Sequence, residues 1–269
     1  MSTNPAPARV SLRGVDRTFG THTVLHEVDI EIEPGEVVAL LGSSGSGKST
    51  LLRLIAGLDS PTGGRIEIDG VAVRGIDPRC AVVFQEPRLL PWRSLTANVE
   101  YGLAPGTARA KGSAAVQHWL DVVGLREFGG HYPRQVSGGM AQRAGLARAL
   151  ARRPRVLLLD EPLAALDALT RLRMQDLLDA VQQEAGTTTV MVTHDVDEAT
   201  ILADRVLILR ADATGGARIA ATHEIAIPKP RDRGDPRITV LRDQLLDELG
   251  VPRRGGANLR AAIDEEATA

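Results

Sequence analysis

Cysteine is nearly absent from this sequence, which has Cys80 alone among 269 residues. A single thiol cannot form an intramolecular disulfide, and it cannot supply a metal site built from several cysteines. Stability must therefore come from buried apolar side chains, and a hydrophobic content of 43% is enough for one large domain or two small ones. A reducing compartment such as the cytoplasm is compatible with this composition.

Long apolar runs are also missing. The runs at Val37–Leu41 and 156–159 have the length of strands, whereas a helix that crosses a membrane needs about 20 apolar residues. Residues 1–9 contain Pro5 and Pro7 but no apolar core of a signal peptide, and we expect them to be flexible. If the protein acts at a membrane, another chain must hold it there.

A large excess of either charge is the third absence. Lys and Arg number 32 against 34 Asp and Glu, which gives a formal net charge of -2. Because the chain has no basic excess that would attract nucleic acid, we expect no nucleic-acid partner.

Strand-like and helix-like segments alternate along the chain, which predicts the α/β class. The apolar run at Val37–Leu41 leads through a glycine-rich turn into a helix at 48–57 that ends at its glycine. Residues 95–150 are predicted to form a mostly helical insertion. The other predicted strands are 10–12, 28–32, 65–68, 81–84, 156–159, 188–193 and 205–209, with one or two antiparallel strands in 218–227.

A last helix is predicted at 238–249, because Asp235 and Pro236 are good helix-start residues and Gly250 stops the pattern. One face of this helix is apolar, which favours packing on its own domain or contact with another subunit. The residues on that face are Ile238, Leu241, Leu245 and Leu249.

A phosphate-binding loop follows the apolar strand. Glycines let successive backbone N–H groups turn toward phosphate oxygens, and the helix N-terminus adds partial positive charge. Lys48 can reach the β and γ phosphates of a nucleotide, and Ser49 can ligate Mg²⁺. On its own this loop fits a kinase, a GTPase or a helicase equally well. The predicted nucleotide-binding residues here are Gly42, Ser43, Ser44, Gly45, Ser46, Gly47, Lys48, Ser49 and Thr50.

Two acids, Asp160 and Glu161, end the apolar run at 156–159. The carboxyl ends of strands are where α/β sheets place their ligands. We expect Asp160 to hold Mg²⁺ through water and Glu161 to polarise an attacking water. Taken alone, the segment could also be a strand that ends in solvated acids.

The run Val136, Ser137, Gly138, Gly139, Met140, Ala141, Gln142 and Arg143 resembles the signature sequence of ABC ATPases. The resemblance extends from about residue 10 to residue 209, with the family's motifs in order. Phe19 stands at the adenine-stacking position, Gln85 at the Q-loop and His194 at the switch histidine. The D-loop corresponds to Ala165, Leu166 and Asp167. Met140, Val136 and Phe19 depart from the commonest residues without removing an essential group.

This resemblance implies the fold of a P-loop NTPase cassette, with a RecA-like core, an antiparallel β subdomain and a helical subdomain at about 95–150. The cassette would span 10–230, followed by a helical extension at 231–252 and a flexible tail at 253–269. It also implies that two cassettes pair head to tail, so that ATP lies between the loop of one and the signature of the other. ATP and Mg²⁺ are the implied cofactors.

The roles implied for individual residues follow the same resemblance. Ser137, Gly138 and Gly139 would contact the nucleotide held by the partner cassette. Glu161, His194 and Gln85 would be catalytic, and Ser49, Gln85 and Asp160 would hold the metal.

The segment from Glu86 to Trp92 and the stretches 230–233 and 249–251 resemble cassettes that serve importers of nitrate, taurine and aliphatic sulfonates. Such a cassette implies two permease subunits, an external solute-binding protein and a peripheral place on the cytoplasmic face of the cell membrane. Leu89, Leu90 and Trp92 would then offer apolar contacts to a permease helix, although Trp92 could instead anchor the helical insertion. An exporter cassette and a non-transport ABC ATPase are the alternative functions.

Overall fold

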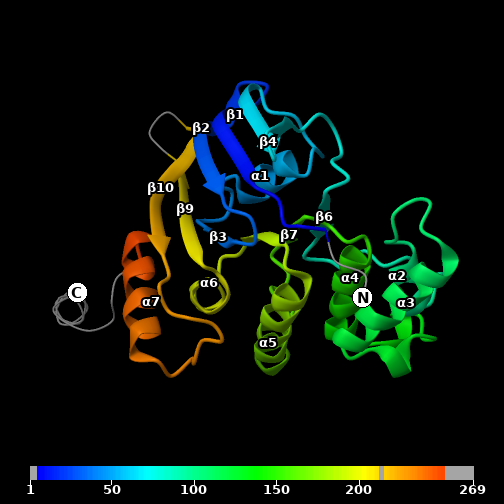
Figure 1. Cartoon of the computed structure of the whole chain (residues 1–269). Helices are drawn as coiled ribbons and strands as arrows, with labels where there is room; N and C mark the ends of the chain where they lie inside the picture. Colours follow the sequence, from blue (N-terminus) through cyan, green and yellow to red (C-terminus); the bar gives the residue numbers. More distant parts are fainter. Residues whose placement is uncertain (1–4, 212–214, 252–269) are drawn as a thin grey trace, which may run out of the picture.

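The computed structural model describes residues 5–211 and 215–251. The flexible tail predicted at 253–269 lies outside these residues, as do residues 1–4. Within the predicted flexible start, Ala8 is buried, and its carbonyl oxygen accepts a hydrogen bond from Thr188 Oγ1. The described chain is built around a sheet of ten strands, with helices on both faces (Figure 1).

The sheet has an antiparallel and a parallel part. The antiparallel part contains β1 (Val10–Phe19), β2 (His22–Ile32), β4 (Gly63–Ile68) and β5 (Val71–Ala72). The parallel part contains β3 (Val37–Leu41), β6 (Cys80–Val83), β7 (Val156–Asp160), β8 (Thr188–Val192) and β9 (Arg205–Ala211). β10 (Ala217–Glu224) joins them, because it lies antiparallel to β9 and parallel to β2. The strand order is β5-β4-β1-β2-β10-β9-β3-β8-β7-β6.

Seven α-helices and two 3₁₀ turns lie among the described residues. They are α1 (Lys48–Ile55), α2 (Leu95–Glu100), α3 (Arg109–Val122), η1 (Arg126–Phe128), η2 (Pro133–Gln135), α4 (Gly138–Ala151), α5 (Ala168–Ala185), α6 (Val196–Leu202) and α7 (Pro236–Glu248). Helices α2, α3 and α4 form a group at one side of the molecule, on the right in Figure 1. Over the described ranges, none of the helices combines the length and apolar character required to span a bilayer.

The α/β prediction is confirmed, and the main strands fall where continuous apolar runs predicted them. The first two strands are longer than predicted. β1 and β2 mix polar and apolar side chains, and their pairing shifts register after Leu12, Val15 and Arg17. These irregularities interrupt the alternation that identifies a strand, so only the most apolar ends were recognisable.

Two apolar cores cover the two faces of the sheet. In β3 all five residues are buried; Val37, Ala39 and Leu41 face one core, while Val38 and Leu40 face the other. The first core contains α2 to α6 and part of α7, and the second contains α1 and the antiparallel strands. A strand covered on both sides must be apolar throughout, which explains why the run at 37–41 has no polar alternation.

The apolar face predicted for the last helix packs on its own chain. Leu245 is fully buried in the first core, and Leu241 and Leu249 pack against that core while half-buried. Asp235 begins α7 by accepting a hydrogen bond from the Arg237 backbone N–H. Of the two interpretations left open by the sequence, packing on the same domain is therefore the one observed.

Gly57 ends α1, as the sequence predicted. Its φ is 67°, its N–H donates to the Leu54 oxygen at 3.0 Å, and the Leu58 N–H donates to the Arg53 oxygen at 2.9 Å. These two bonds satisfy carbonyl groups that a helix end leaves free. A Cβ at Gly57 would also overlap the carbonyl group of Gly75.

We predict that Gly57→Ala destabilises the chain by about 1–3 kcal/mol more than Gly70→Ala, measured by urea unfolding. Gly70 has a similar φ of 72° but open space around it, so its replacement carries the backbone strain alone, about 1–2 kcal/mol. Equal losses in the two variants would contradict the close approach to Gly75.

Candidate functional site

The glycine-rich loop connects the carboxyl end of β3 to α1. Gly45 and Gly47 have φ values of 81° and 87°, in the left-handed region that favours glycine. A Cβ at Gly47 would lie 2.9 Å from the Leu25 side chain, so the loop is also closely packed. The first backbone N–H of α1 with a partner in the loop or helix is that of Leu51, which donates to the Gly47 oxygen at 2.9 Å. Within the described part of the chain, the N–H groups of the three preceding residues, at the first turn of α1, have no helical acceptors.

Lys48 lies inside this loop and is 6% exposed. Its Nζ donates to the carbonyl oxygens of Gly42 and Ser43, both at 2.8 Å. Burial lowers the pKa of Lys48, while the charges of Glu161 and Asp160 act to raise it. The ammonium group is thus held by two neutral carbonyl oxygens of the loop, and an anion such as phosphate could take their place as its acceptor.

The two predicted acids lie at the end of β7, close to the loop. Ser49 Oγ donates to Asp160 Oδ1 at 2.8 Å. Glu161 has a φ of 46°, and its N–H donates to the Val192 oxygen at 3.0 Å. That bond fixes the Glu161 backbone against the neighbouring strand, β8, in a conformation that glutamate seldom adopts.

β8 ends at Val192, and His194 is the second residue after it. Its Nδ1 lies 3.4 Å from Glu161 Oε2. The histidine side chain is 62% exposed and the glutamate side chain 26% exposed, so both can reach a bound ligand. The structure thus brings Lys48, Ser49 and the two acids together with the histidine at one edge of the sheet.

A group of polar residues next to His194 in the structure was not identified from the sequence. Thr193 Oγ1 donates to Glu198 Oε2 at 2.6 Å, and Glu198 is 2% exposed. Arg171 donates to Leu166 O at 3.2 Å and to Asp195 Oδ2 at 3.4 Å, and its Nε lies 3.9 Å from Glu198. Arg171 therefore links the predicted D-loop to Asp195 and Glu198, two residues that follow the histidine.

The signature residues lie apart from this cluster. Ser137 is the N-cap of α4, where its Oγ accepts a hydrogen bond from the Met140 N–H at 3.2 Å. A Cβ at Gly139 would meet Thr170 of α5 at 2.7 Å. Ser137 and Gly138 are exposed, so a donor-rich helix N-terminus faces outward from the helical group.

Three other predicted residues have distinct surroundings. Phe19 is 47% exposed, and the guanidinium of Arg17 lies 4.0 Å from its ring centroid. Gln85 is exposed two residues after β6, which pairs with β7 and so ends at the same edge of the sheet. Asp167 caps α5 by accepting a hydrogen bond from the Thr170 N–H at 3.0 Å.

The loop and its neighbours fit a nucleotide with a divalent cation. Free helix N–H groups and the Lys48 ammonium are donors for phosphate oxygens. Ser46 Oγ is buried and has no hydrogen-bond partner within the described part of the chain, so it is a further donor. Ser49 and Asp160 supply the hydroxyl and carboxylate oxygens that Mg²⁺ prefers.

The chain is similar to a known protein family and to several known proteins. The family model described as "ABC transporter" matches residues 25–164. The chain is 50% identical over 242 residues to the aliphatic sulfonates import ATP-binding protein SsuB of Granulibacter bethesdensis, covering 90% of this chain and 94% of that protein. It is 48% identical over 221 residues to SsuB 1 of Xanthomonas axonopodis pv. citri, covering 81% and 86% respectively.

A solved structure extends the comparison to three dimensions. It is the dimeric post-hydrolysis state of the ATP-binding cassette MJ0796 bound to ADP and Pi. The similarity has a TM-score of 0.69 at 32% identity, and it covers 81% of this chain and all of that one, 100%.

The buried carboxyl group of Glu198 generates a pH prediction. Burial raises its pKa from 4.5 to about 6, with Asp195 adding to this, while the Thr193 hydrogen bond, Arg171 and His194 act to lower it. Because the pKa is higher in the folded chain, the unfolded chain loses this proton at a lower pH. The free energy of unfolding therefore falls by about 2 kcal/mol as the pH rises from below 4.5 to above 6.

We predict that Glu198→Gln removes this loss while keeping an acceptor for Thr193. The free energy of unfolding of the variant, relative to wild type, should rise by about 2 kcal/mol between about pH 4 and pH 7 in urea titrations. A difference that stays constant over that range would contradict the raised pKa.

Proposed function

The chain belongs to the ABC transporter family, and from that premise we propose that it is the ATP-hydrolysing subunit of an importer for aliphatic sulfonates. The observation that carries the proposal is the gathering of Lys48, Ser49, Asp160, Glu161 and His194 at one edge of the sheet. Relatives that are named for aliphatic sulfonate import match 81% and 90% of the chain at 48% and 50% identity. Among sulfonates, taurine and nitrate, these names favour sulfonates.

The proposed chemistry is transfer of the γ-phosphoryl group of ATP to water. Ser49, Asp160 and Gln85 would hold Mg²⁺, which when bound would neutralise phosphate charge and orient the β and γ phosphates. Lys48 exchanges its carbonyl acceptors for phosphate oxygens. Glu161 orients the attacking water and accepts its proton, and His194 contacts the γ-phosphate from the neighbouring strand.

Completion of the site requires a second cassette. The solved relative is a dimer, and the exposed signature residues of this chain face outward from the helical group. In a head-to-tail pair, Ser137, Gly138 and Gly139 of each chain close the nucleotide site of the other. Phe19 supplies a ring face for adenine, on the side of the ring that Arg17 leaves free.

The permease contact is proposed at the loop that follows Gln85. Trp92 is 71% exposed, so it does not anchor the helical group to the core. The loop beneath it is held by Asn98, which is fully buried. The amide of Asn98 bonds the Leu90 N–H at 2.7 Å and the carbonyl oxygens of Leu90, Arg93 and Ser94 at 3.0 to 3.1 Å. An apolar side chain on a fixed loop suits a groove that receives a helix.

Two permease subunits follow from the import role of the relatives, and an external solute-binding protein completes the proposed complex. The cassette would sit peripherally on the cytoplasmic face of the membrane, held by the permease.

We predict that Glu161→Gln retains ATP affinity but lowers the rate of hydrolysis by about 10²–10⁴-fold, because the amide cannot accept the proton of water. Binding is measured with a fluorescent ATP analogue and turnover by phosphate release. Glu100→Gln, an exposed glutamate at the end of α2, is the control and should match wild type. Normal turnover in Glu161→Gln would overturn the catalytic assignment.

The transport role is tested by uptake in cells that lack this protein. We expect wild type, but not Glu161→Gln, to restore uptake of a labelled alkanesulfonate, with taurine and nitrate tested in parallel. Restoration of nitrate or taurine uptake alone would change the solute. If no uptake depends on the chain, the importer proposal fails while the ATPase assignment stands.

We predict that Trp92→Ala lowers sulfonate uptake several-fold while ATP hydrolysis by the purified chain stays within about twofold, because an exposed interface anchor contributes mainly to partner binding. Ile76→Ala, at an equally exposed position between β5 and β6, is the control and should leave both measurements unchanged. Equal loss of uptake and hydrolysis in Trp92→Ala would contradict a permease contact.

A further inference from the structure

Helix α6 connects the switch histidine to the C-terminal part of the chain. His194 precedes the N-cap of α6, Asp195, whose carboxylate accepts hydrogen bonds from the Asp197 and Glu198 N–H groups. The helix is only seven residues long, from Val196 to Leu202. Because it has about two turns, disorder at its C-terminal end would extend to the end that carries the histidine.

The C-terminal end of α6 is closed by one side chain from far along the sequence. Arg231 Nη1 donates to the oxygens of Thr200 and Ile201 at 3.1 and 3.2 Å, and also to the oxygen of Ala203. These are carbonyl groups at the end of α6, where a helix lacks internal donors and its dipole favours a cation. The Arg231 side chain is 1% exposed.

The remaining donors of Arg231 hold the segment that carries it. Nε donates to the Ile227 oxygen at 2.8 Å, and Nη2 donates to the Ile225 oxygen at 3.3 Å. Burial lowers the pKa of Arg231, while Asp204 and Asp179 act to raise it. A buried guanidinium is tolerated only when its donors are used, and here all three nitrogens donate to carbonyl oxygens.

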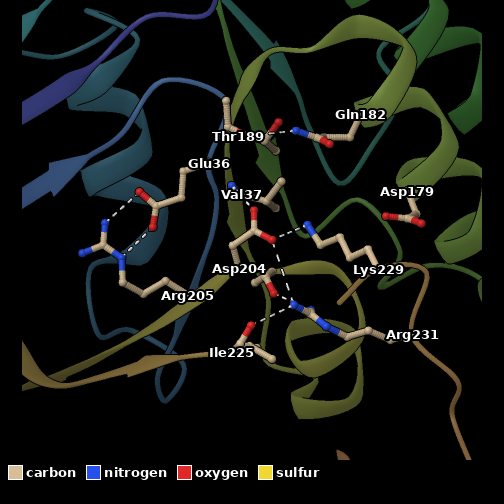
Figure 2. A network of polar contacts seen from close by, with 12 residues as sticks. Glu36, Val37, Asp179, Gln182, Thr189, Asp204, Arg205, Ile225, Lys229 and Arg231 are labelled. Carbon is tan, nitrogen blue, oxygen red and sulfur yellow. Dashed lines mark hydrogen bonds and ion pairs between the residues drawn. The ribbon is translucent and has the colours of Figure 1, made fainter. Parts of the chain in front are cut away.

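A second tie fixes this segment to the central sheet (Figure 2). Asp204 Oδ1 pairs with Lys229 Nζ at 2.8 Å, and Asp204 Oδ2 accepts a hydrogen bond from the Val37 N–H at 2.9 Å. Val37 is the first residue of β3, the strand that leads into the phosphate-binding loop. Through Asp204, the segment that carries Lys229 and Arg231 is therefore linked to β3, the strand that leads into the proposed nucleotide site.

We infer that Arg231 is a positioning residue for ATP hydrolysis, which fixes α6 and thereby holds His194 against Glu161. The inference rests on the proposed function. It gives the segment after β10 a role in catalysis, although that segment contributes no group to the nucleotide site. The link runs from Arg231 through the seven residues of α6 to its N-cap, where Arg171 and Glu198 hold the other end.

The test compares Arg231→Met and Arg231→Lys with wild type in the full chain. Methionine has a similar length but no donors, whereas lysine keeps the charge with a single ammonium group. The control is Arg237→Met, since Arg237 is an exposed arginine of α7 that pairs with Asp235 beside it. The measurements are affinity for a fluorescent ATP analogue, kcat per ATP-binding site, and hydrogen exchange of 193–202 against 48–55.

Arg231→Met should lower kcat about 10- to 100-fold, as expected when a catalytic group is displaced by about 1 Å, with the ATP affinity within twofold of wild type. Exchange should rise in 193–202 and not in 48–55, and Arg231→Lys should recover part of kcat. Unchanged kcat per site, or exchange that rises equally in both segments, would overturn the inference.

If Arg231→Met does not fold, Lys229→Met tests the same idea, because it releases the tie to Asp204 without emptying the guanidinium site. It should give a smaller fall in kcat with the same local rise in exchange, and wild-type kcat would overturn the inference. A wild-type chain that binds ATP without hydrolysing it contradicts the proposed function instead.

Discussion

The pairing of β7 with β8 is the constraint on which the site depends. Asp160 lies opposite Val192 in this parallel pair, and the Val192 carbonyl oxygen also accepts the N–H of Glu161. One strand thus ends in the acids at the position where the other leads into His194. A shift of one residue in this register would turn every side chain of the shifted strand to the opposite face and would separate the acids from the histidine. The apolar residues on both faces of β7 hold the register, because they fill two separate cores.

The parallel half of the sheet and the glycine-rich loop between β3 and α1 could be predicted from the sequence, because both depend on neighbours along the chain. A strand buried on both faces must be continuously apolar, and a loop that approaches phosphate needs glycine at defined positions. Gly57 was recognisable for the same reason, since a helix end with a left-handed residue is a local event. Cys80 is buried, and burial raises the pKa of its thiol to about 12, which disfavours the thiolate form.

The parts that could not be predicted depend on contacts between distant residues. Nothing near Arg171 in the sequence indicates that its guanidinium spans Leu166, Asp195 and Glu198. Arg231 stood within a segment that suggested only a subgroup of transporters, and its carbonyl partners on α6 are about 30 residues earlier in the chain. The full lengths of β1 and β2 could not be predicted, because register shifts interrupt their alternation and no single residue type marks such a shift. The signature residues matched a pattern, but the exposure of Ser137 and Gly138 follows from the helical group that carries them.

The burial of Asn98 has a consequence for the permease contact that we propose at Trp92. Its amide satisfies four backbone groups of the loop below Trp92, so the loop already has its final conformation before any partner arrives. Ordering a loop upon association costs conformational entropy, and here that entropy is lost during folding and not during binding. The exposed indole can therefore contribute most of its apolar surface to affinity. For the same reason, a displacement of the helical group should move the loop as a rigid body, so that motion is passed to the partner with little lost in bending.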